Sequence, residues 1–112
     1  MEKLISNITN EIYNSIMSTI KDNPNAEDEE NHCGYYSIND RYRIYVFFQE
    51  ALAKGQHWFK DGYFEVWIEE VTESSIDGYD STSSDTNSKR SLKIAITELL
   101  ENNQDILDLK SA

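Results

Sequence analysis

The 112-residue sequence contains one cysteine, one proline and four glycines, and it has no long apolar run. A single cysteine, Cys33, excludes an intramolecular disulfide and favours a reducing compartment inside the cell. No apolar stretch approaches the ~20 residues that cross a bilayer, and polar residues interrupt the apolar ones near the N-terminus, so we expect no membrane contact and no signal peptide. We therefore expect a cytoplasmic protein with a single domain over residues 1–112.

Two long segments contain no lysine or arginine. Residues 22–40 hold six acidic residues and residues 61–88 hold eight, whereas residues 41–60 carry a net charge of +3 within a total of -11. Nucleic-acid phosphates require clustered Lys and Arg, so the sequence does not favour direct nucleic-acid binding. Two readings stay open for the acidic surface: it attracts a basic protein partner, or it serves solubility alone.

Hydrophobic periodicity predicts a helix at each end of the chain. An apolar stripe over residues 2–21 predicts the first helix, which stops at Asp22-Asn23-Pro24 because the residue before proline avoids helical angles. A second stripe predicts a helix at 91–102, capped by Ser88 or Ser91. Three apolar residues in the tail dock on the body or pair with a partner. The first stripe repeats at Leu4, Ile8, Ile12, Ile16 and Ile20; the second comprises Leu92, Ala95, Ile96, Leu99 and Leu100; the tail holds Ile106, Leu107 and Leu109.

Alternating residues between the helices predict strands. Two strands, 35–38 and 41–49, flank an Asn39-Asp40 turn, and the second is central or covered on both faces. The segment 63–72 is the clearest strand, and Ile76 and Tyr79 extend the sheet or add another strand. Residues 50–62 fit either a helical turn or a hairpin arm. Residues 22–33 read as an acidic loop and residues 80–91 as a flexible loop or linker.

This order of elements predicts an α+β fold in which an antiparallel sheet of about 3–5 strands packs against an N-terminal and a C-terminal helix.

Four groups of side chains have the residue types for chemistry but lack the spacing that it needs. Metal sites require three or four ligands at a defined cadence, and calcium loops also require a glycine turn. Glycosidase carboxylates require a deep groove. We therefore expect no catalytic residue, metal or cofactor, and no enzyme. The groups are His32 with Cys33; Cys33 with His57; Glu73 with Asp77, Asp80 and Asp85; and Glu65, Glu69, Glu70 and Glu73.

A tryptophan among acids is the strongest candidate for a binding site. Alternation places Trp67 on the same face as Glu65 and Glu69, where an exposed tryptophan with a charged rim would act as an interface anchor. The alternative is that the second helix or a loop covers that face. The predicted partner-binding residues are Glu65, Trp67, Glu69, Glu70, Glu73 and Asp77.

A homodimer is the second hypothesis for function. Tyr45 and Phe47 form an apolar second face on their strand, and a second copy of the chain would cover it without another partner. A small enzyme with dispersed residues is the third hypothesis.

The two acidic blocks, with the element order around Tyr42–Gln49 and Tyr63–Thr72, resemble small acidic proteins of phages and mobile elements, including DNA-mimic and anti-CRISPR proteins. The resemblance implies an inhibitor whose carboxylates stand in for DNA phosphates at a basic nucleic-acid-binding protein. No family motif is matched, so no functional residue is carried over. Abundant Ile, Asn and Ser also suggest an AT-rich bacterial or phage genome.

Overall fold

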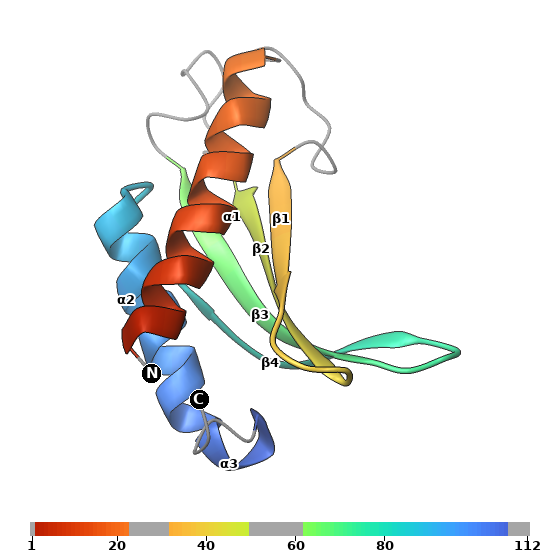
Figure 1. Cartoon of the computed structure of the whole chain (residues 1–112). Helices are drawn as coiled ribbons and strands as arrows, with labels where there is room; N and C mark the ends of the chain where they lie inside the picture. Colours follow the sequence, from red (N-terminus) through yellow and green to blue (C-terminus); the bar gives the residue numbers. More distant parts are fainter. Residues whose placement is uncertain (1, 23–31, 50–61, 108–112) are drawn as a thin grey trace.

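The computed structural model describes residues 2–22, 32–49 and 62–107, and it has the predicted α+β fold (Figure 1). Four antiparallel strands follow one another in the order β1-β2-β3-β4, between an N-terminal helix and a C-terminal pair of helices. The elements are α1 (Glu2–Asp22), β1 (Cys33–Ser37), β2 (Tyr42–Gln49), β3 (Tyr63–Val71), β4 (Ile76–Ser83), α2 (Lys89–Asn102) and α3 (Gln104–Leu107).

Both long helices lie on the same face of the sheet (Figure 1). The core that they form with alternate residues of β2 and β3 contains the predicted apolar stripe of α2 and, from α1, Ile5, Ile8, Ile12 and Ile16. Removing this apolar surface from water is the main favourable term in folding. The buried apolar residues on the helix side of the sheet are Tyr42, Ile44, Val46, Phe48, Phe64, Val66 and Ile68.

Side-chain hydrogen bonds fix the ends of the elements. The β1–β2 turn closes where Asn39 Oδ1 accepts hydrogen bonds from the backbone N–H groups of Arg41 and Tyr42, at 2.9 and 2.8 Å. Between the two candidate caps, Ser88 is the N-cap of α2, since its Oγ accepts a hydrogen bond from the Ser91 N–H at 3.0 Å. Of the three apolar tail residues, Leu107 docks on the body and is buried, Ile106 is exposed, and Leu109 lies outside the described residues.

The prediction that 80–91 is a flexible loop or linker is wrong. Residues 80–83 complete β4, and α2 begins at Lys89. The turn between them is fixed by Ser84, which exchanges hydrogen bonds with the backbone of Phe64, and by the Thr86 N–H, which donates to Ser91 Oγ at 3.0 Å. The composition misled because an exposed edge strand needs polar residues just as a loop does.

Smaller differences concern boundaries. β1 begins at Cys33 rather than Tyr35, since Cys33 pairs with Phe47 in the ladder. Of the predicted acidic loop at 22–33, Asp22 is the last residue of α1, Cys33 belongs to β1, and residues 23–31 lie outside the described residues. The predicted helical turn or hairpin arm at 50–62 lies outside the described residues except for its last position. Across the described ranges, no helix combines the length and the apolar character that a membrane crossing requires.

A matched pair of isoleucines tests the core. Ile68 on β3 is fully buried, whereas Ile76 on β4 is 52% exposed. We expect Ile68→Ala to lower the free energy of unfolding by about 2–5 kcal/mol, because it removes buried methyl groups and leaves a cavity. Ile76→Ala should cost no more than about 1 kcal/mol. Urea unfolding followed by circular dichroism measures both; equal losses would contradict the assignment of the buried face.

Candidate protein-binding face

The face of the sheet opposite the helices is the candidate site, and we call it the open face. Residues directly opposite one another in paired strands share a face, so the register defines its members. None of the helices in the described part of the chain covers it, because α1 and α2 both pack on the other side (Figure 1). The open face comprises Cys33, Tyr35, Ser37, Arg43, Tyr45, Phe47, Tyr63, Glu65, Trp67, Glu69, Val71, Ile76, Gly78, Ser81 and Ser83.

A row of aromatic side chains crosses the middle of this face. Tyr35 is opposite Tyr45, and Tyr45 is opposite Trp67. The ring of Phe47 lies 6.2 Å from that of Tyr45. Tyr35 is 61% exposed, whereas the other three are half-buried among themselves. A shallow hollow of about 250 Å³ lies between Tyr45, Phe47 and Trp67. Contiguous apolar surface of this kind on a small protein is typical of an interaction site.

Gly78 lets the Trp67 indole lie against the backbone of β4. A Cβ at position 78 would lie 3.0 Å from two carbons of the indole ring, which is closer than side chains normally approach. A bulge between Ile68 and Glu69 shifts the register so that Gly78, and not its neighbour Tyr79, stands opposite Glu69. The glycine therefore fixes where the largest ring on the open face lies.

Arg43 joins the aromatic row to an acidic residue. Its Nε donates to Glu69 Oε1 at 2.7 Å, and both side chains are about four-fifths buried. Its guanidinium also lies 4.9 Å from the ring centre of Tyr35 and 5.8 Å from that of Tyr45. A guanidinium at these distances is attracted by the aromatic quadrupole. Arg43 therefore holds both tyrosines in place and neutralises Glu69.

The six predicted partner-binding residues separate into two groups. Glu65, Trp67 and Glu69 lie together on the open face, as alternation predicted. Glu70 and Asp77 are opposite one another at the far end of the β3–β4 hairpin, on the other face, and Glu73 lies in the exposed turn that joins these strands. The predicted set is therefore not one continuous row of carboxylates.

Glu70 is also neutralised within the chain. Its Oε2 accepts hydrogen bonds from Arg41 Nε at 3.0 Å and from the Tyr42 hydroxyl at 3.1 Å. Loss of water around Tyr42, and then this hydrogen bond, raise the pKa of the tyrosine. Because both Glu69 and Glu70 already face an arginine, the predicted carboxylates without an ion pair among the described residues are Glu65, Glu73 and Asp77.

Sequence reasoning missed three members of the site: Tyr35, Arg43 and Gly78. The alternation along Tyr42–Gln49 already placed Arg43 beside the apolar Tyr45 and Phe47, so that signal was available. Tyr35 and Gly78 join the face only through cross-strand register, which turn geometry and the bulge determine. The reading in which the second helix covers Trp67 is wrong, since α2 lies on the opposite face.

The residues weighed for metal or thiol chemistry do not gather into a site. Within the described ranges, no three His, Cys, Asp or Glu side chains lie close enough together to hold a metal ion. His32 is buried, and Cys33 is half-buried on the open face. His57, its suggested partner, lies outside the described residues.

Comparisons with known proteins add no relative: no protein-family model, curated protein or solved structure matches this chain.

The titration of Tyr45 tests the packing of the open face. Burial, followed by the hydrogen bond with Cys33, raises the pKa of Tyr45 to about 12 from the ordinary value of 10.0. The folded protein then holds this proton more tightly than the unfolded chain does. The contribution of Tyr45 to stability is therefore complete below pH 10.0 and is lost as the pH rises through about 12.

NMR of tyrosine labelled with ¹³C at the ring carbon that bears the hydroxyl measures this pKa, with Tyr45→Phe assigning the resonance. The same variant should lose less stability than the wild type between pH 10.0 and about 12. A midpoint for Tyr45 near the ordinary value would show that the ring is solvated and that the aromatic row is not packed as described.

Proposed function

We propose that this chain is a non-enzymatic protein-binding module whose open face receives a basic protein partner. The observation that carries the proposal is the half-buried aromatic row around Trp67, on a sheet face that no described helix covers. Binding energy at protein interfaces concentrates in a few aromatic and arginine side chains near the centre of the contact. Trp67, Tyr45 and Arg43 are side chains of these types, and they are already held in place by their neighbours.

The charge around this centre favours a basic partner. Glu65 lies on the open face, and Glu73 and Asp77 lie on the exposed hairpin beyond it. The chain as a whole carries a net charge of -11. The negative electrostatic potential that follows from this charge raises the rate at which a basic protein associates with the chain. It also orients the basic protein during the approach, and both effects weaken with salt.

The more specific form of the proposal is a DNA-mimic inhibitor that acts in the cytoplasm of a bacterium on a basic nucleic-acid-binding protein, encoded by a phage or a mobile element. Its support is the long acidic segment over residues 61–88, which contains no base. The ion pairs at Glu69 and Glu70 remove two carboxylates from the imitation of phosphates. This form therefore relies on Glu65, Glu73 and Asp77, with the aromatic row supplying the contact area.

A homodimer that uses the open face is the second candidate. Tyr45 and Phe47 supply the apolar surface, and Arg43 and Glu69 already neutralise each other within the chain, so neither brings an unpaired charge to a two-fold contact there.

Capture of partners by variants of the tagged chain tests the proposal. From nuclease-treated bacterial lysate at low salt, the wild type should retain a basic nucleic-acid-binding protein, identified by mass spectrometry. Trp67→Ala should weaken its affinity about 30-fold, as expected when a central anchor worth about 2 kcal/mol is removed. Reversing Glu65 and Glu73 to Lys should also weaken capture, and the loss of affinity relative to the wild type should be larger at low salt than at high salt.

The control reverses Glu2 and Glu11, two exposed residues on α1, and changes the net charge by the same amount. Capture that fell equally in this control would reflect net charge alone and contradict a specific face. Undiminished capture by Trp67→Ala would contradict the anchor. Duplex DNA added as a competitor tests the DNA-mimic form of the proposal. A captured protein that binds DNA and the chain at the same time would exclude mimicry but would agree with the more general proposal of a protein-binding module.

A further inference from the structure

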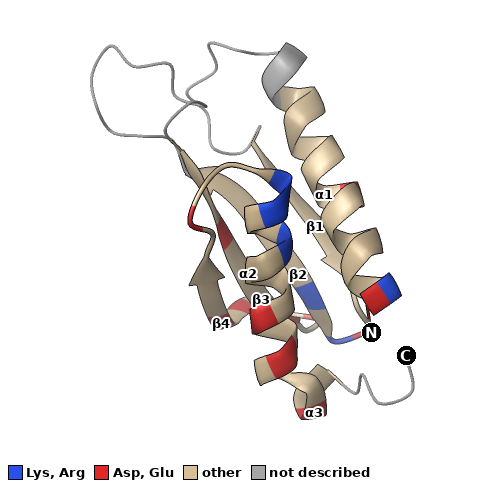
Figure 2. Cartoon of the chain, turned by 90° about the vertical axis from the view of Figure 1, so that its left-hand side faces the viewer, with Lys and Arg blue, Asp and Glu red and all other residues tan. Residues whose placement is uncertain are grey.

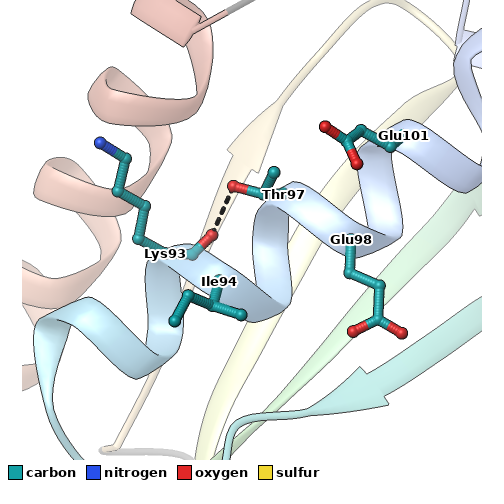
Figure 3. Close-up of a pocket in the computed structure, with 5 residues that line it drawn as sticks. All are labelled: Lys93, Ile94, Thr97, Glu98 and Glu101. Carbon is teal, nitrogen blue, oxygen red and sulfur yellow. Dashed lines mark hydrogen bonds between the residues drawn. The ribbon is translucent and has the colours of Figure 1, made fainter.

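The outer surface of α2 has features that neither the core nor the open face uses. Opposite its buried stripe, the helix presents Arg90, Ile94, Thr97 and Glu101, and Lys93 and Glu98 flank them; we call these six residues the outer stripe. Ile94 is 56% exposed. It lies in a surface hollow of about 340 Å³ that five of the six residues line. Figure 3 shows Lys93 and Glu98 pointing to opposite sides of the helix, with Ile94 between them.

The charges of α2 run against its own stability. Basic residues occupy its N-terminal half and acidic residues its C-terminal half (Figure 2), with no acid in the first turn and no base in the last. The helix macrodipole favours the reverse order. Neighbours along the surface also repel, since Arg90 and Lys93 are three residues apart, as are Glu98 and Glu101. None of these four side chains forms an ion pair with a described residue.

The outer stripe is complementary to itself when a second helix runs antiparallel. Arg90 and Glu101 lie equally far from the midpoint of the stripe, between Ala95 and Ile96, and so do Lys93 and Glu98. Ile94 and Thr97 are related in the same way. A two-fold axis through this midpoint would place the basic half of each helix along the acidic half of the other and the two exposed isoleucines near the centre.

We propose that a second copy of this chain packs antiparallel along the outer stripe of α2, forming a symmetric dimer. The basic N-terminal half of each helix then lies beside both the acidic side chains and the negative dipole end of its partner, so the repulsions within one chain are offset between the two. A helix of 14 residues is about 21 Å long, so the contact is smaller than a standard interface. The dimer should therefore be weak and sensitive to salt.

Charge reversal tests the dimer by sedimentation equilibrium. At low salt and increasing concentration, the wild type should approach twice the 13.0 kDa mass of one chain. The variant Arg90→Glu/Lys93→Glu and the variant Glu98→Lys/Glu101→Lys should each lose about 100-fold or more in dimer affinity, because like charges then meet across the contact. An equimolar mixture of the two variants should restore the dimer, since opposite charges again face one another.

A variant that carries all four reversals should dimerise with itself. It has the net charge of the wild type, and its charges follow the macrodipole, so a fold defect cannot account for its behaviour. A wild type that stays monomeric up to about 1 mM would overturn the proposal. So would a mixture of the two variants that stays monomeric, or a dimer that persists in either variant alone. Trp67→Ala distinguishes this dimer from one through the open face, because it should leave the mass unchanged.

Discussion

Both long helices pack against the same face of the sheet. This one-sided packing determines which side chains of the sheet stay accessible to solvent or to a partner. Four isoleucines of α1 (Ile5, Ile8, Ile12 and Ile16) and the apolar stripe of α2 pack over the inner residues of β2 and β3, so the core of the described residues lies on that side. The opposite residues of the same strands, among them Tyr45 and Trp67, are left to pack against one another across the sheet. Their partial burial is a consequence of mutual contact, which explains how large rings are accommodated on a face that no described helix covers.

Ion pairs contribute less to the stability of this arrangement than the burial of the apolar core does. The exposed pair Arg41–Glu70 contributes about 0–1 kcal/mol at most, as surface ion pairs do. The less exposed pair Arg43–Glu69 has a second role, because the same guanidinium contacts Tyr35 and Tyr45. Within the acidic segment 61–88, the carboxylates next to the arginines of the β1–β2 hairpin are therefore neutralised by ion pairs. Those near the β3–β4 turn have no ion pair among the described residues. A basic surface that approaches the sheet meets aromatic rings first and carboxylates at the margin.

Periodicity in the sequence was sufficient for both helices, for β2 and β3, and for the residues that each element buries, because burial on one side leaves a regular pattern. It failed where exposure removes that pattern. The end of β4, Asp80–Ser83, is polar because it lies at an edge, and its composition is that of a loop. The contact between Gly78 and Trp67 and the pair Arg43–Glu69 depend on register, which the turns and the bulge determine. The open face was therefore predictable in its residues from β2 and β3, but not in its extent across β1 and β4.

The outer stripe of α2 and the open face lie on opposite sides of the domain, so occupation of one leaves the other accessible (Figure 1). A dimer through α2 and a partner on the open face can therefore form at the same time. An antiparallel pair of α2 helices would join two domains through their helical layers and direct two open faces outward. Two weak contacts on one partner assembly strengthen each other through effective concentration, provided that the geometry allows both to form. A charge order on α2 that lowers the stability of one chain is then compensated in a dimer, where it selects the antiparallel arrangement and leaves both aromatic rows free.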